Sequence, residues 1–146
     1  QAGLYAEALK CIETIQESPR LLALRASLLK QLGKPEASYE AATQALEGDT
    51  EARALALDTL GELARAKGQL TEAMQFYKRS GVLWRSLGNQ RFWARELNNV
   101  GIILSLQGKE EEALATYQTA LEAASDNASL KGKMLTNIAF SLDRLG

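Results

Sequence analysis

A spacing of small and aromatic residues that occurs twice, 40 positions apart, limits the fold of this chain more than any other feature. Both copies follow the order small residue, glycine, alanine, tyrosine, small residue, and they are Gly61, Gly68, Ala73, Tyr77, Ser80 and Gly101, Gly108, Ala113, Tyr117, Ala120. A weaker copy in the same frame lies 35 positions before the first, and it is Ala26, Gly33, Ser38, Ala42, Ala45. Self-similarity at a fixed period of about 20–50 residues is typical of repeat architectures. We therefore expect a series of similar structural units.

Residues 95–121 show what one unit contains. Apolar residues recur at helical spacing on both sides of a short turn at residues 107–109. This pattern predicts two antiparallel helices, with Gly101 facing the methyl group of Ala113 so that the two backbones approach closely. Tyr117 is expected to fill the groove toward the next helix.

The same periodicity, read along the whole chain, predicts eight helices and no strand. Gly33 is expected to end a helix in the left-handed conformation, Pro35 to begin the next one, and Asp49 or Thr50 to cap the fourth. The predicted helices are Leu4–Gln16, Arg20–Leu32, Pro35–Glu47, Thr50–Lys67, Thr71–Leu87, Arg91–Gln107, Glu110–Ala124 and Lys131–Leu145.

The recurrence of these positions in register resembles the tetratricopeptide repeat family over essentially the whole chain. The resemblance implies an all-α, right-handed α-solenoid of about eight antiparallel helices. It divides the single array into 1–17 (second helix of a partial repeat), 18–52, 53–92 and 93–126 (three repeats), and 127–146 (first helix of a further repeat). Because both ends fall inside a repeat, we expect a fragment of a longer protein or self-association through the uncapped ends.

Composition disfavours two classes of partner. The chain has 17 Lys and Arg residues against 18 Asp and Glu residues, a net charge of −1, so it lacks the basic excess that neutralises nucleic-acid phosphates. No apolar run approaches the roughly 20 residues that span a bilayer. Only one cysteine occurs, which fits a reducing compartment, and we expect a cytoplasmic protein.

Catalytic chemistry is not indicated. Without histidine, Ser-His and Cys-His nucleophile pairs and imidazole zinc sites are excluded, and no glycine-rich phosphate loop occurs. Cys11 is interpreted as a buried structural thiol, and Glu110–Glu112 as the solvated first turn of a helix. We therefore expect no enzyme activity, no metal and no cofactor.

The large aromatic residues lie where the two 40-residue units are longer than the common 34-residue repeat, and they are Phe76, Trp84, Phe92 and Trp93. The favoured interpretation is that their rings fill the gap between lengthened neighbouring helices. An aromatic pocket for a small ligand is the alternative.

The candidate binding surface is the concave side, which the first helix of each unit lines in a solenoid. A basic residue one turn before an asparagine recurs there as Arg95–Asn99 and Lys133–Asn137, and both pairs could hold a peptide backbone and its acidic groups. The second unit lacks this basic–asparagine pair and has Leu55 and Thr59 at the corresponding positions. The alternative is that the asparagines satisfy backbone groups and the cations are solvated. The candidate residues are Glu62, Arg65, Arg95, Asn98, Asn99, Ile102, Lys133, Asn137 and Phe140.

The first helix of the third unit narrows the resemblance to the LGN-type subgroup of tetratricopeptide proteins. The repeats of bacterial signal-transduction ATPases and their transcription activators are also similar. The first subgroup implies that Arg95, Asn99, Lys133 and Asn137 contact an extended peptide. We therefore expect a non-catalytic scaffold that binds a protein or peptide in its concave groove. The alternative is a sensor or interaction segment of a larger bacterial transcriptional or signal-transduction regulator.

Overall fold

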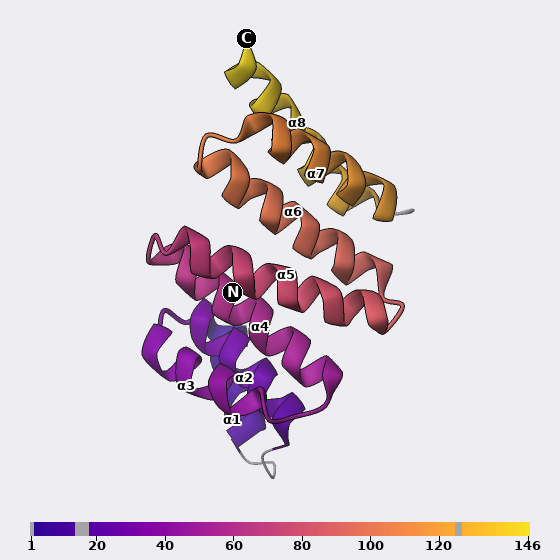
Figure 1. Ribbon diagram of the computed structural model, residues 1–146. Coiled ribbons are helices and arrows are strands. Elements are labelled where there is room, and N and C mark those ends of the chain that lie inside the picture. Colours follow the sequence, from indigo (N-terminus) through magenta and orange to yellow (C-terminus); the bar gives the residue numbers. More distant parts are fainter. Residues whose placement is uncertain (1, 14–17, 125–126) are drawn as a thin grey trace.

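A computed structural model describes residues 2–13, 18–124 and 127–146, and these ranges contain eight helices and no strand (Figure 1). The prediction of an all-α fold is confirmed, and helix ends differ from the predicted ones by a few residues. Residues 14–16, where the first helix was expected to end, lie outside the described residues. The helices are α1 Ala2–Glu13, α2 Pro19–Gln31, α3 Pro35–Ala45, α4 Thr50–Ala66, α5 Leu70–Ser86, α6 Gln90–Leu106, α7 Glu110–Ala123 and α8 Ala128–Leu145.

Side-chain caps and glycines set the helix ends. The Asp49 carboxylate accepts a hydrogen bond of 2.8 Å from the backbone N–H of Ala52, and the Asn127 side chain accepts one of 2.9 Å from Leu130. At four of the turns between helices a glycine adopts the left-handed conformation, which costs it no Cβ clash. These glycines are Gly33, Gly68, Gly88 and Gly108, with φ values of 69°, 75°, 70° and 76°.

Consecutive helices pack as antiparallel hairpins that follow one another along the molecule (Figure 1). The most extensive packing is within the pairs α4–α5, α6–α7 and α2–α3, and α5 packs in turn on α6. Helix α8 packs chiefly on α7 and touches α6 less extensively. The hairpins therefore place α2, α4, α6 and α8 in one series and α3, α5 and α7 in another.

The close approach within a hairpin is made by glycine and tyrosine. A Cβ atom placed on Gly101 would lie 2.7 Å from Cδ1 of Tyr117, and one on Gly61 would lie 2.7 Å from Cε1 of Tyr77. Both tyrosines are buried. The expectation that Gly101 faces the methyl group of Ala113 is therefore wrong, because the flat ring is the group that needs the missing side chain.

Aromatic rings fill the space between the lengthened helices of the second unit, as the favoured interpretation expects. Helices α5 and α6 have 17 residues each. The rings of Trp84 and Phe92 stack between them, with centroids 4.4 Å apart and planes at 18°. Phe76 packs against the apolar core clusters. Trp93 lines an open cavity on the α5–α7 side, and Phe92 and Phe76 each border a smaller one.

Two expectations about single side chains are wrong. Cys11 is exposed, because it lies two residues after the buried Leu9 and so points to the other side of α1. Glu110 is buried, whereas Glu111 and Glu112 are exposed as expected. Its Oε1 atom lies 2.9 Å from Arg144 of α8, which folds back over the start of α7.

Helix α8 carries four exposed large hydrophobic side chains, which are Leu135, Phe140, Leu142 and Leu145. No helix in the described residues is long and apolar enough to cross a membrane.

Candidate functional site

Charged side chains connect the series of helices α2, α4 and α6. Lys30 of α2 forms an ion pair with Glu62 of α4. Nη2 of Arg95 on α6 lies 2.8 Å from Oδ2 of Asp58 on α4 and 3.0 Å from Oε1 of Glu96. Two predicted site residues, Glu62 and Arg95, therefore make contacts between hairpins, and Arg95 is held in a fixed position.

Glu96 is the most deeply buried carboxyl group of this network. Burial raises the pKa of Glu96 to about 8, and the negative charge of Asp58 adds to the effect while Arg95 opposes it. The raised pKa favours the neutral carboxyl group, so Asp58 is the partner that chiefly balances the positive charge of Arg95.

The raised pKa of Glu96 makes stability depend on pH. The group binds its proton more tightly in the folded than in the unfolded chain, so its stabilising contribution is complete below about pH 4.5 and is lost as the pH rises through about 8. The slope that one proton can give is at most about 1.4 kcal/mol per pH unit. Urea unfolding between pH 5 and 9 (about one measurement per pH unit) should show this fall, and Glu96→Gln should flatten it. The exposed Glu72→Gln is the control, and an unchanged slope in Glu96→Gln would contradict the assignment.

Asparagine side chains connect α6 with α8. Oδ1 of the buried Asn98 accepts a hydrogen bond of 2.9 Å from Nδ2 of Asn137. Nδ2 of Asn99 donates to Oε2 of Glu96 at 3.4 Å. These asparagines thus bond to side chains of the helix series rather than to backbone groups at turns. The contact between Asn98 and Asn137 fixes how α8 lies on α6.

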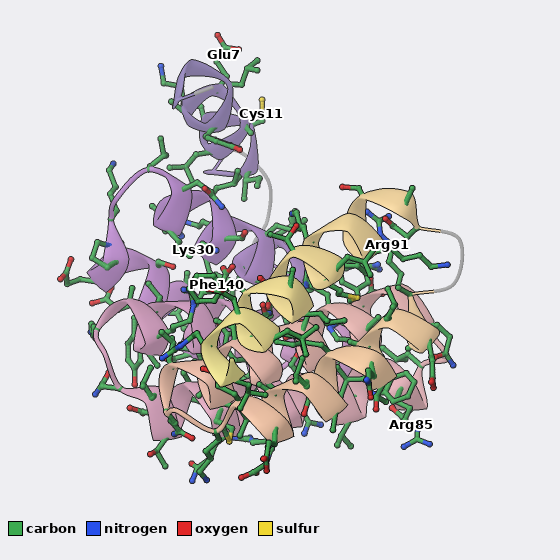
Figure 2. The ribbon with its side chains drawn as sticks, turned by 90° about the horizontal axis from the view of Figure 1, so that it is seen from above. Glu7, Cys11, Lys30, Arg85, Arg91 and Phe140 are labelled. Carbon is green, nitrogen blue, oxygen red and sulfur yellow. The ribbon has the colours of Figure 1, made fainter. Side chains whose placement is uncertain are left out.

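A cavity of about 160 Å³ lies between the first turns of α6 and α8 and brings three cations together. Arg95 and Lys133, both predicted site residues, line it, although they are 38 positions apart in the sequence. Arg91 is the third cation, and Figure 2 shows it beside the start of α8. The guanidinium group of Arg95 lies over the ring of Phe92, 4.6 Å from its centroid. The full lining is Arg91, Phe92, Arg95, Asn127, Ser129, Leu130 and Lys133.

Sequence reasoning missed Arg91, although a signal was present. It precedes Arg95 by one helical turn, so both lie on one face of α6. Its place beside Lys133 depends on how α8 packs, which periodicity does not give.

The other predicted residues lie outside this cavity. Ile102 is half-buried against the apolar cluster that contains Tyr117. Phe140 is 62% exposed, with the guanidinium group of Arg144 5.9 Å from its ring centroid. Arg65 is exposed near the end of α4.

Comparison with known proteins agrees with this architecture. Residues 95–127 match the family model described as tetratricopeptide repeat. The fold is similar to that of BtubC (BKLC) from P. vanneervenii, with a TM-score of 0.74 and 19% identity over 97% of this chain and 63% of that one. It is also similar to MamA, with a TM-score of 0.59 and 16% identity over 97% of this chain and 85% of that one. The chain thus spans less than two thirds of BtubC. A comparison with curated proteins gives no match.

The stacked hairpins define the class of protein, an α-solenoid built from helical repeats. Residues 95–127 match the tetratricopeptide repeat model, which confirms the resemblance seen in the sequence for that segment. Tetratricopeptide repeats generally serve as protein-interaction scaffolds, so this broad class of function is supported for the chain. The expected boundaries of the individual repeats stay a prediction.

Proposed function

We propose that the chain is a non-catalytic scaffold whose α6–α8 side binds an extended protein segment carrying an acidic group. The observation that carries the proposal is the cavity shared by Arg91, Arg95 and Lys133. Arginine and lysine donate charge-assisted hydrogen bonds to carboxylates, and arginine can do so with two parallel bonds. Neither a metal nor a cofactor has a role in this proposal.

The charges around the cavity favour an anion. Asp58 already pairs with Arg95, and the raised pKa of Glu96 lessens the negative charge beside it. Arg91 and Lys133 form no ion pair with any residue in the described part of the chain. The cavity thus keeps an excess of about two positive charges. Asn99 lies one turn after Arg95 and offers amide groups to a peptide backbone.

Arg91 and Lys133 provide the test, because changing Arg95 would also break its ion pair with Asp58. An array of extended peptides that differ in the number and position of Asp and Glu residues is probed with the folded protein. We expect the wild type to prefer acidic peptides, and Arg91→Ala combined with Lys133→Ala to weaken the best one about tenfold, or about 1.4 kcal/mol.

The matched control is Lys78→Ala with Arg85→Ala, which removes the same charge from α5. This control should bind the peptide as the wild type does. Equal losses in both double variants would show a general charge effect and refute the proposed site, as would the absence of any preference for acidic peptides.

The alternative, a sensor segment of a larger bacterial regulator, stays a prediction. Of the four aromatic residues considered for it, Trp84 and Phe92 stack ring against ring, and Phe76 packs against the core. Self-association through the ends and a cytoplasmic location likewise stay predictions.

A further inference from the structure

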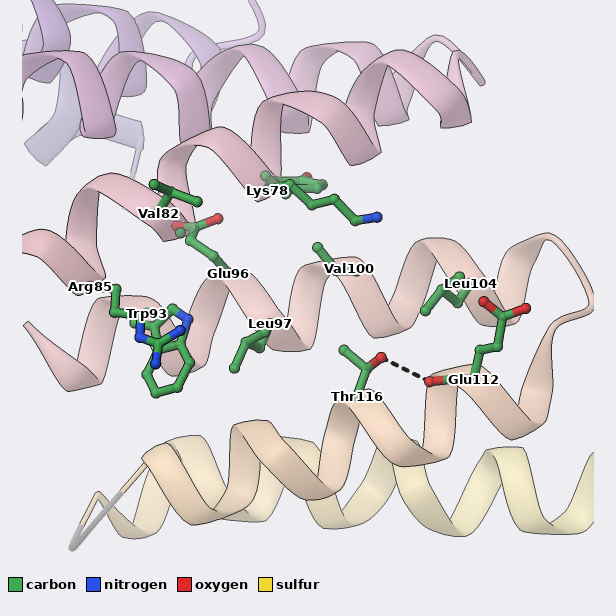
Figure 3. A pocket seen from close by; sticks show the side chains of 12 residues that line it. Lys78, Val82, Arg85, Trp93, Glu96, Leu97, Val100, Leu104, Glu112 and Thr116 are labelled. Atoms are coloured by element: carbon green, nitrogen blue, oxygen red, sulfur yellow. Dashed lines mark hydrogen bonds between the residues drawn. The ribbon is translucent and has the colours of Figure 1, made fainter.

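A second, larger groove lies between α5 and α7, with α6 as its floor (Figure 3). Its volume is about 480 Å³. The apolar side chains of its floor recur every three or four residues along α6, and they are Trp93, Leu97, Val100 and Leu104. The buried Glu96 of the same helix also lines the groove. At about 1.5 Å per residue the four apolar side chains span about 16 Å, the length of three helical turns. The floor is thus an apolar stripe of the length that an amphipathic helix covers.

The two walls carry opposite charges. Lys78, Val82 and Arg85 line the groove from α5, and Glu112 and Thr116 line it from α7 (Figure 3). Val82 is 67% exposed at the crest of α5. A partner lying in the groove therefore meets cations along one edge and a carboxylate on the other.

The basic character of α5 continues beyond the groove. On the other side of Lys78 and Val82 lies a cavity of about 290 Å³ that Arg53 and Arg79 also line. Within the described residues, Lys78, Arg79 and Arg53 form no ion pair. The guanidinium group of Arg85 lies 4.9 Å from the centroid of the Trp93 ring. A row of unpaired cations beside a recessed apolar stripe is complementary to acidic residues on the edge of a helix.

We propose that this groove binds an amphipathic helix of a protein partner. Apolar residues at i, i+4, i+7 and i+11 of that helix would lie on the α6 floor, and its acidic edge would face Lys78 and Arg85. Glu112 on α7 favours a basic residue on the opposite edge of the partner helix, so the charges of the two walls determine the direction in which that helix lies. A flat membrane surface fits less well, because Val100 and Leu104 are buried at the bottom of the groove.

This site is separate from the one proposed for an extended acidic segment. Figure 2 shows Arg85 at the edge of the molecule away from α8, whereas Arg91 lies beside the start of α8. The two sites share no lining residue. Each can therefore be removed by substitution without changing the side chains of the other.

The probe is a synthetic helical peptide of about five turns, with leucines at the four positions named above and glutamates along one edge. A second peptide carries lysine in place of each glutamate. Binding is followed by anisotropy of labelled peptide and by emission of Trp93, with Trp93→Phe identifying which tryptophan reports. We expect the glutamate peptide to bind and to shift the Trp93 emission, and the lysine peptide to bind at least about tenfold more weakly.

Lys78→Glu with Arg85→Glu should raise the Kd of the glutamate peptide at least about tenfold. Arg91→Glu with Lys133→Glu changes the net charge equally and should leave that Kd unchanged. Failure of the wild type to bind the glutamate peptide would overturn the proposal, as would equal binding of the two peptides or equal losses in both double variants. Sedimentation with phosphatidylserine vesicles that requires Lys78 and Arg85, without peptide binding, would assign a membrane surface instead and also overturn it.

Discussion

Replacing Gly101 by leucine is expected to lower the free energy of unfolding by about 1–3 kcal/mol. Gly101 lies on α6 where the ring of Tyr117 on α7 contacts the helix backbone, and even a Cβ atom there would lie 2.7 Å from Cδ1 of that ring. The tyrosine is buried, so its ring cannot move aside without opening the hairpin. Urea unfolding followed by far-UV circular dichroism measures the loss.

Gly132→Ala is the matched control for this substitution. Gly132 is also inside a helix, but no atom lies within 4 Å of the position its Cβ would take. The change should stabilise the chain by about 0.5–1 kcal/mol, because alanine loses less backbone entropy than glycine on folding. If Gly101→Leu behaved like Gly132→Ala, the glycine–tyrosine contact would not be what brings α6 and α7 together.

Replacing Trp84 by alanine is expected to cost about 3–5 kcal/mol. Trp84 is 1% exposed, and its ring stacks on Phe92 between α5 and α6, the junction of two successive hairpins. Loss of the ring would leave a cavity at that junction. Thermal and urea unfolding of the variant measure the effect.

Trp93→Ala separates the two interpretations of the aromatic residues. Trp93 lies nine positions later and lines the open α5–α7 groove, so its loss should destabilise the chain clearly less than the loss of Trp84. Equal costs for the two substitutions would mean that Trp93 is a core residue as well, and would contradict its place in an open groove.

The helices were predictable because each carries its own start and stop signals. Asp49, Pro35 and the glycines at turns act within a few residues of their own position, so the sequence alone locates them. The recurrence of Gly61 and Gly101 with Tyr77 and Tyr117 then identified the repeat. The identity of the group facing each glycine was not predictable, because periodicity gives the face of a helix but not the register of its neighbour.

Contacts between hairpins could not be predicted from the sequence for the same reason. The pairing of Glu110 with Arg144 joins residues from different hairpins, and a run of three glutamates gives no sign that one of them is buried. Arg95 and Lys133 were selected by their spacing to asparagine, yet only the packing of α8 on α6 and α7 places them at one cavity. The α5–α7 groove depends on how far apart two non-sequential helices lie, and its basic edge went unnoticed.

The central claim is that α6 and α8 present Arg91 and Lys133 side by side, and a crosslinking measurement tests it most directly. In a Cys11→Ser background, Arg91→Cys with Lys133→Cys is treated with a short bismaleimide, and Lys78→Cys with Lys133→Cys is the control. We predict an intramolecular crosslink, seen by intact mass and gel mobility, in the first pair and not in the second. Absence of the crosslink in the first pair, or equal crosslinking in both, would contradict the shared surface.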